Sequence, residues 1–251
     1  MQERLVALVT GGSRGIGAET AIALAEHGYD VALTYRNKAV RAQEVATAIT
    51  RLDKEALALC CDITQADDIA HLFQQIGEWR GHLNILVLNA SGGMERNLVA
   101  ADPDYAMHIN CDAQLVLVKA ALPLMHLGGS IVFVTSHWAH LYGKMPQLPA
   151  YEPVAESKHT GEQALRALQP ELHTRGLRLL VVTGDLIEGT ITPKLLERGA
   201  PGLIERRRTT QGALPTARDM GQAIVQAALN PALAGGTTIV IGASLESMLA
   251  P

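Results

Sequence analysis

Short apolar runs alternate with longer amphipathic stretches along the chain. The apolar runs have the length of β-strands and are apolar on both faces, which is typical of a parallel sheet covered by helices on both sides. They comprise residues 5–9, 31–35, 56–60, 85–89, 130–135, 177–183 and 237–241. The helical stretches comprise residues 18–27, 38–52, 66–79, 103–124, 153–174 and 217–229. This alternation predicts an α/β fold, a doubly wound Rossmann domain whose seven-stranded parallel sheet carries three helices on each face.

Two connections are longer than the others. Residues 184–215 follow the sixth predicted strand and are rich in glycine and proline, and residues 137–150 follow the fifth strand. Long connections at the carboxyl edge of such a sheet are commonly functional, so we predict that residues 184–215 form a lid over a ligand. No repeat, low-complexity tract or polar linker divides the chain, and we therefore expect one domain over residues 1–251.

The composition excludes several classes of protein. With 48% hydrophobic residues and a net charge of −4, the chain is too apolar to be disordered. The low aromatic content of 4% and the absence of a basic excess argue against nucleic-acid binding. The apolar runs are too short to span a membrane, and no apolar leader is evident. Cys60, Cys61 and Cys111 are expected to be buried free thiols, so we expect a cytoplasmic protein.

A glycine-rich turn follows the first predicted strand and leads directly into a helix. It reads Thr10-Gly11-Gly12-Ser13-Arg14-Gly15-Ile16-Gly17. Glycines let the backbone turn sharply and approach a pyrophosphate, while the helix N-terminus offers free N–H groups to the phosphates. Because the motif lies between a strand and a helix, it predicts a dinucleotide-binding site.

The end of the second predicted strand indicates which dinucleotide binds. A site for NAD commonly has an acidic residue there, which binds the ribose hydroxyls. This chain has Tyr35, Arg36 and Asn37 instead. Arg36 and Arg14 would suit the 2′-phosphate of NADP(H), because a guanidinium group binds phosphate through paired hydrogen bonds. We therefore predict NADP(H) as the cofactor, with the alternative that both arginines are ordinary surface residues.

Further candidate ligands follow the third and fourth predicted strands. Asp62 and Ile63 come after the third strand, where the Asp62 carboxylate would accept a hydrogen bond from the adenine amino group. The alternative is that Asp62 caps the next helix. Asn89-Ala90-Ser91 end the fourth strand at the same edge of the sheet, so we expect them to line the same site.

These motifs together resemble the short-chain dehydrogenase/reductase family. The resemblance rests on Thr10–Gly17, Asp62, Asn89-Ala90, Asn110, Ser136 and Lys158, and it covers essentially the whole chain. It implies a single Rossmann domain and a homotetramer formed through two long central helices and the last strand. It also implies cofactor contacts from Gly11, Ser13, Arg14, Gly15, Ile16, Gly17, Tyr35, Arg36, Asn37, Asp62, Ile63, Asn89, Ala90, Ser91, Lys158, Gly184 and Ile187.

The catalytic positions depart from the ordinary family pattern at one place. The family has a tyrosine four residues before the lysine, and this chain has Val154 there, which cannot donate a proton. The nearest tyrosine is Tyr151, seven residues before Lys158. This spacing resembles the third type of enoyl-acyl-carrier-protein reductase. The resemblance implies that Tyr151, Lys158, Ser136 and Asn110 are the catalytic residues, and that Asn110 bends its helix and relays protons through water.

The resemblance implies an NADPH-dependent oxidoreductase that reduces the activated double bond of an enoyl thioester. Tyr151 would stabilise the negative charge on the thioester oxygen, and Lys158 would fix the cofactor and supply positive charge. Reduction of a ketone needs nearly the same residues, so a carbonyl reductase stays open as an alternative. Val154 leaves a second alternative, a non-catalytic NADP-binding relative. An alcohol dehydrogenase that uses NAD is disfavoured by Arg14 and Arg36.

The expected partners follow from this chemistry. We expect a small-molecule or carrier-linked acyl substrate, bound to coenzyme A or to an acyl-carrier protein, and neither nucleic acid nor membrane. Arg206-Arg207-Arg208 in the predicted lid form either a solvated run or a docking point for an acidic carrier or a phosphate.

Three aromatic or imidazole side chains lie near the predicted site. His137 and His140 have no evident third ligand, so we predict no metal and expect both to line the pocket or to lie on the loop surface. Tyr142 is either a second pocket tyrosine or a simple loop aromatic.

Overall fold

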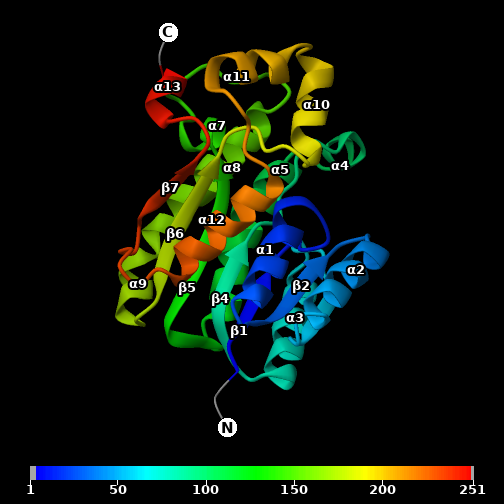
Figure 1. Cartoon of the computed structure of the whole chain (residues 1–251), viewed down its shortest axis with the longest axis vertical. Coiled ribbons are helices and arrows are strands. Elements are labelled where there is room, and N and C mark those ends of the chain that lie inside the picture. Colours follow the sequence, from blue (N-terminus) through cyan, green and yellow to red (C-terminus); the bar gives the residue numbers. More distant parts are fainter. Residues whose placement is uncertain (1–3, 250–251) are drawn as a thin grey trace.

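The computed structural model describes residues 4–249. Seven parallel strands form one sheet in the order β3-β2-β1-β4-β5-β6-β7 (Figure 1). The strands are β1 (Val6–Val9), β2 (Asp30–Tyr35), β3 (Ala56–Cys60), β4 (Leu83–Leu88), β5 (Met125–Ser136), β6 (Arg178–Gly184) and β7 (Thr238–Ile241). The predicted doubly wound α/β fold is confirmed, and the clearest boundary difference is that β5 begins at Met125 rather than at residue 130.

Helices cover both faces of the sheet. The helices that cover the two faces are α1 (Gly15–Glu26), α2 (Ala39–Thr50), α3 (Ala66–Trp79), α6 (Ala113–Ala121), α8 (Glu152–Ala167) and α12 (Ala217–Leu229). Because successive strand residues point to opposite faces, Val6 and Leu8 of β1 pack towards α3, α6 and α8, whereas Ala7 and Val9 pack towards α1, α2 and α12. The prediction of three helices on each face is therefore confirmed. None of the helices within residues 4–249 is long and apolar enough to cross a membrane.

Two predicted helices are interrupted. Residues 103–124 form α5 (Tyr105–Met107), a π-helical turn η1 (His108–Asp112) and then α6. Residues 153–174 form α8 and a separate α9 (Gln169–Thr174), because Pro170 lacks the N–H that would continue the helix. The π turn lies where α8 crosses the chain, so the first interruption has a packing cause that periodicity does not reveal.

Close packing of α8 against η1 depends on Gly161. A Cβ there would clash with the carbonyl oxygen of Asn110 and lie 3.1 Å from the Cα of Cys111. We therefore expect Gly161→Ala to lower the free energy of unfolding, measured in urea, by about 1–3 kcal/mol. Gly77→Ala in α3 is the control, because a Cβ there would lie 3.8 Å from Leu124, an ordinary contact distance. Alanine favours the helix more than glycine does, so we expect the free energy of unfolding to stay unchanged or to rise by up to about 1 kcal/mol. Equal losses in the two variants would contradict this explanation.

Short helices gather at the carboxyl edge of the sheet, at the top of Figure 1. They are α4 (Arg96–Ala101), α7 (His137–His140), α10 (Ile191–Gly199), α11 (Leu203–Gln211) and α13 (Leu245–Leu249). Four of them contribute to an apolar cluster, here called the cap cluster, of Trp138, Ala139, Leu141, Tyr151, Val154, Ala155, Leu186, Leu196, Leu203, Leu214 and Met248. The predicted lid therefore consists largely of two helices, α10 and α11, that share a small core with the loop after β5.

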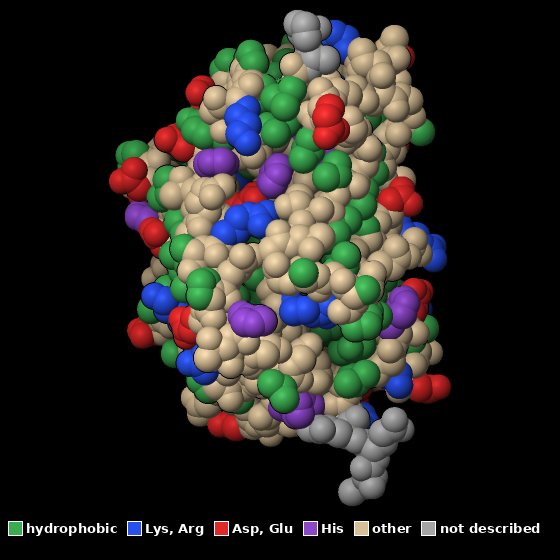
Figure 2. Space-filling model, turned by 90° about the vertical axis from the view of Figure 1, so that its left-hand side faces the viewer, with side chains coloured by type: hydrophobic (Ala, Val, Ile, Leu, Met, Phe, Trp, Pro, Cys, Tyr) green, Lys and Arg blue, Asp and Glu red, His purple; other side chains and the backbone are tan. Residues whose placement is uncertain are grey.

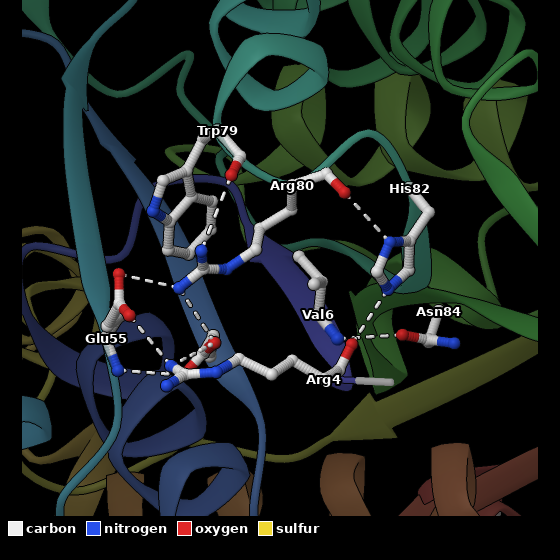
Figure 3. A network of polar contacts seen from close by, with 8 residues as sticks. Arg4, Val6, Glu55, Trp79, Arg80, His82 and Asn84 are labelled. Atoms are coloured by element: carbon white, nitrogen blue, oxygen red, sulfur yellow. Dashed lines mark hydrogen bonds and ion pairs between the residues drawn. The ribbon is translucent and has the colours of Figure 1, made fainter. Parts of the chain in front are cut away.

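An ion-pair network lies at the amino ends of the strands, opposite the edge where the short helices gather (Figure 3). The buried Asp30 carboxylate, at the start of β2, lies 3.2 Å from Arg4 and 3.0 Å from Arg80. Glu55 pairs with the same two arginines, and the Arg80 guanidinium lies over the Trp79 ring. Burial opposes ionisation of Asp30, but hydrogen bonds from the Glu55 backbone and from Arg4 outweigh it and lower its pKa. This network joins β2 to the end of α3, so its role is structural.

β7 forms one edge of the sheet. The side chain of Val240 in this strand is 37% exposed. Figure 2 views the molecule from the side of β7 and α9, and hydrophobic side chains lie there in patches between scattered charges. A homotetramer formed through this strand and the central helices stays a prediction.

Candidate active site

A cavity of about 690 Å³ opens at the carboxyl edge of the sheet, beside the cap cluster. Its walls come from the segments that follow β1 to β6 and from α10. Every residue predicted to contact the cofactor lines this cavity, and so do Ser136 and Tyr151. The fold therefore brings together residues that are far apart in the sequence, and Asn110 alone among the predicted site residues lies outside the lining.

The loop between β1 and α1 has the shape that a close-lying pyrophosphate requires. Gly11 has a φ of +67°, which glycine adopts without strain. A Cβ at Gly17 would clash with the carbonyl oxygen of Gly11 and lie 2.6 Å from Nδ2 of Asn89. Helix α1 begins at Gly15 without a side-chain cap, so the first N–H groups of the helix are available to phosphate oxygens.

Asn89 holds this loop against the end of β4. Its amide Nδ2 donates to the carbonyl oxygens of Thr10 at 2.9 Å and Gly11 at 3.3 Å. In return, the Thr10 hydroxyl accepts hydrogen bonds from the backbone N–H groups of Asn89 and Ala90 at 3.0 Å. The predicted cofactor residue Asn89 therefore shapes the wall of the cavity through its side chain.

Asp62 lies at the end of the cavity where the adenine is expected. Its Oδ1 accepts hydrogen bonds from the backbone N–H and the hydroxyl of Thr64, at 3.1 and 2.7 Å. This turn precedes α3, whose N-cap position is Gln65, so Asp62 is not the helix cap. Within residues 4–249, Oδ2 of Asp62 accepts no hydrogen bond and remains available to a ligand.

The two predicted phosphate-binding arginines line the same cavity. Arg14 precedes α1, and Arg36 follows β2. Nη1 of Arg36 donates a hydrogen bond to the hydroxyl of Tyr105 at 2.5 Å. Tyr105 belongs to α5, which lies between β4 and β5 in the chain, and it lines the cavity as Arg36 does. This hydrogen bond therefore joins two separate parts of the cavity wall.

Tyr151 directly precedes α8 and faces the cavity. Its side chain is 6% exposed, and its hydroxyl donates a hydrogen bond to Oγ of Ser136 at 3.0 Å. Burial raises the pKa of Tyr151, and the Ser136 contact offsets this only in part. Val154 is buried one turn later, near Gly93. The aliphatic side chain of Val154 thus occupies the ordinary tyrosine position. The phenol that reaches Ser136 belongs to Tyr151, three residues earlier.

Lys158 lies in α8, and its side chain is buried. Nζ donates a hydrogen bond to the carbonyl oxygen of Val134 in β5 at 3.0 Å. Burial lowers the pKa of Lys158 to about 8. The ammonium group is therefore largely charged at pH 7 and lines the same cavity as Tyr151 and Ser136.

Asn110 connects the central helices. Its amide Nδ2 donates to the carbonyl oxygen of Gly92 at 2.9 Å and to Oγ of Ser157 at 3.0 Å, and its Oδ1 accepts from the Gly92 N–H at 3.3 Å. These bonds fix the loop after β4 against α8, next to Lys158. Asn110 lies in the π-helical turn η1. Its expected part in bending the helix and in proton relay stays a prediction.

The lid is anchored to the sheet by an ion pair. Nη2 of Arg207 in α11 lies 2.6 Å from Oδ2 of the buried Asp185, which follows β6. The Arg207 guanidinium also lies over the Trp138 ring, which contacts the Tyr151 ring edge to face. Arg208 pairs with Glu188 at 2.6 Å. The prediction of a solvated run is therefore wrong for Arg207, which holds the lid in place, whereas the Arg208 side chain is 48% exposed. Docking of an acidic carrier or a phosphate on this run stays a prediction.

Several side chains lie elsewhere than predicted. His137 is fully buried between the Thr183 hydroxyl and the Ala243 carbonyl, and His140 contacts Glu162, so neither lines the cavity. Within residues 4–249 no cluster of His, Cys, Asp or Glu suits a metal ion. Cys60 is exposed, because it ends the edge strand β3 and points away from the core, whereas the other two cysteines are buried and free.

Comparison with known proteins decides the family. Residues 5–198 match the family model described as short chain dehydrogenase. The chain belongs to the short-chain dehydrogenase/reductase family. Its relatives include hydroxynaphthalene reductase arp2 of Aspergillus fumigatus, 31% identical over 202 residues, 78% of this chain and 71% of the relative. They also include 1-cyclohexenylcarbonyl-CoA reductase of Streptomyces collinus, 29% identical over 188 residues, 74% of this chain and 65% of the relative.

Solved structures agree with this short-chain dehydrogenase/reductase assignment. A short chain dehydrogenase from Burkholderia cenocepacia in complex with NADP superposes with a TM-score of 0.84 at 29% identity, covering 97% of this chain and 98% of that one. A blue fluorescent protein from a metagenomic library in complex with NADPH superposes with a TM-score of 0.82 at 25% identity, covering 98% of both. The family assignment therefore rests on sequence and on fold.

The short-chain dehydrogenase/reductase site also contains residues that the sequence did not indicate. Tyr105, Trp138, Met94 and Leu196 all line the cavity. Tyr142, in contrast, lies outside the lining and packs against His159. None of these five belongs to a motif, and only the packing of the short helices decides which of them reach the cavity.

Proposed function

We propose that this chain is an NADPH-dependent reductase of activated double bonds, with enoyl thioesters of coenzyme A or an acyl-carrier protein as substrates. The observation that carries the proposal is the buried Tyr151 hydroxyl on Ser136, in the cavity that Lys158 also lines. A proton donor must come within hydrogen-bond reach of the reacting oxygen, and this phenol is placed to do so. The same placement argues against the non-catalytic alternative.

The cavity fits a phosphorylated dinucleotide. Gly17 leaves no room for a side chain beside the loop, and the free N–H groups of α1 face the cavity. The end of β2 carries Arg36 where an acidic residue would favour NAD. Solved relatives bound to NADP and NADPH support the same choice. In this proposal the cofactor supplies a hydride, and all other steps belong to residues of the chain.

The residues around the reacting atoms suit stabilisation of the negative charge that hydride addition creates. As hydride adds to the β-carbon of an enoyl thioester, the electron pair of the double bond moves towards the thioester oxygen. In the structure the single O–H of Tyr151 points to Ser136. In this proposal it turns to the thioester oxygen and stabilises the enolate, while the Ser136 hydroxyl donates to the phenol oxygen. A proton from solvent then reaches the α-carbon and completes the reduction.

The substrate side of the cavity is largely apolar. Met94, Trp138, Val154, Leu186 and Leu196 line it, which suits an acyl group. The similarity to 1-cyclohexenylcarbonyl-CoA reductase supports a thioester substrate. The similarity to hydroxynaphthalene reductase arp2 keeps a carbonyl reductase as the second candidate.

Initial rates of cofactor oxidation test the proposal. The purified chain should oxidise NADPH faster than NADH with crotonyl-coenzyme A, and faster with crotonyl-coenzyme A than with acetoacetyl-coenzyme A. A higher rate with acetoacetyl-coenzyme A or with ketones would select the second candidate. Absence of NADPH oxidation with thioesters and with a panel of ketones would reject both candidates.

A further inference from the structure

Tyr105 lies at the rim of the cofactor cavity without belonging to any recognised motif. Its side chain is 6% exposed and packs in the core beneath the loop that follows β4. A Cβ at Gly92 would lie 3.0 Å from Cε1 and 3.2 Å from the hydroxyl of Tyr105, so the ring is closely confined. The phenol is therefore a fixed group, whereas Arg36 reaches it from the end of β2 on a long, flexible side chain.

The hydrogen bond between these residues leaves the charge of Arg36 unopposed. Nη1 of Arg36 donates to the Tyr105 hydroxyl at 2.5 Å, and the guanidinium carbon lies 6.0 Å from the ring centroid. Burial raises the pKa of Tyr105, so its phenol is neutral at physiological pH. Within residues 4–249, Arg36 forms no ion pair with a carboxylate, and its Nε and Nη2 donate no hydrogen bond.

A guanidinium group has five N–H donors in a planar fork, and one of them suffices for Tyr105. The remaining donors can bind two oxygens of one phosphate. Fixing one edge of the fork lowers the conformational entropy that phosphate binding would otherwise remove from Arg36. A ribose hydroxyl gains much less from such a group, because it carries no charge.

We propose that Tyr105 is a specificity-determining positioning residue, which holds Arg36 towards the 2′-phosphate of the cofactor and thereby favours NADPH over NADH. This inference rests on the NADPH preference proposed above. It differs from the simpler assignment of Arg36 alone, because it assigns part of the discrimination to a neutral side chain in another element of the fold.

Two nucleotide fragments test the proposal without any catalytic assay. 2′,5′-ADP and 5′-AMP differ only in the 2′-phosphate, and their dissociation constants are measured by isothermal titration calorimetry. We expect Tyr105→Phe to weaken 2′,5′-ADP binding by about three- to tenfold, the fold-change for loss of one ordinary hydrogen bond, because Tyr105 acts on the phosphate only through Arg36. Binding of 5′-AMP should change by less than about twofold. Tyr29→Phe is the control, since Tyr29 is buried on the other face and does not line the cavity.

A double-mutant cycle shows whether Tyr105 acts through Arg36. In an Arg36→Leu background, Tyr105→Phe should leave 2′,5′-ADP binding unchanged. Equal weakening in both backgrounds would overturn the proposal, and so would tighter binding of both nucleotides to Tyr105→Phe, which would mean that Tyr105 holds Arg36 away from the ligand. If the wild-type chain binds the two nucleotides equally, the NADPH preference itself fails. If it prefers 2′,5′-ADP and Tyr105→Phe retains that preference, this inference alone fails.

Discussion

Tyr151→Phe is expected to lower kcat/KM for the acyl substrate by about 10²- to 10⁴-fold, the range for loss of a positioned proton donor. The variant removes one hydroxyl and keeps the ring that packs against Trp138. NADPH affinity should change little, because the phenol contacts Ser136 and not the glycine loop. Steady-state rates and NADPH binding, measured by cofactor fluorescence, separate these two effects.

Tyr142→Phe is the matched control. Tyr142 lies in the same loop but outside the cavity lining, with its ring against His159. Its activity should stay within about twofold of the wild type, as for a substitution away from the site. Loss of activity in Tyr142→Phe with retention in Tyr151→Phe would reverse the assignment of the proton donor. Full activity in both variants would mean that neither phenol is the proton donor.

The sequence predicts the parts of this site that local backbone geometry determines. The turn from Thr10 to Gly17 is such a part, since its glycines are required by a positive φ at Gly11 and by close contact at Gly17. Strand alternation likewise determines that Asp62 and Asn89 reach the same edge of the sheet. In each case the signal lies within a few consecutive residues.

Other parts of the site depend on contacts between distant segments. The π turn at Asn110 follows from the close approach of Gly161, which belongs to another helix. The contact of Tyr105 with Arg36 joins residues 69 positions apart. The function of Arg207 as a lid anchor depends on Asp185, and a run of three arginines gives no sign of that partner. Such pairings are set by tertiary packing, which single-sequence patterns do not encode.

The position of Tyr151 combines both kinds of information. The spacing to Lys158 predicts a tyrosine one turn beyond the ordinary place, and Pro153 is compatible with the first turn of α8. That the phenol turns inward depends on the cap cluster, in which Trp138 and Val154 pack beside it. The lid anchor and the proton donor therefore share one small core, and the helices of the lid help to determine where the phenol lies.

Lys158 should give activity a distinct dependence on pH. Burial lowers its pKa to about 8, so its ammonium group is charged below that pH and neutral above it. If the charged form holds the cofactor and stabilises the enolate, kcat/KM for NADPH is flat between pH 6 and 7.5 and falls about tenfold per unit well above pH 8. Tyr151 does not add a second step in this range, because its pKa is raised and the phenol keeps its proton.

Lys158→Met tests whether this ammonium group is responsible. The variant keeps the length of the side chain and removes the charge, so we expect kcat/KM to fall by about 10²- to 10³-fold, as for loss of a preorganised charged donor. The step near pH 8 should disappear with it, because no group is left to titrate there. Lys119→Met, at an exposed position of α6 outside the cavity lining, should retain both the rate and the pH profile. A Lys158→Met variant that keeps the step would show that another group titrates, and the positive charge would then have to come from elsewhere in the cavity.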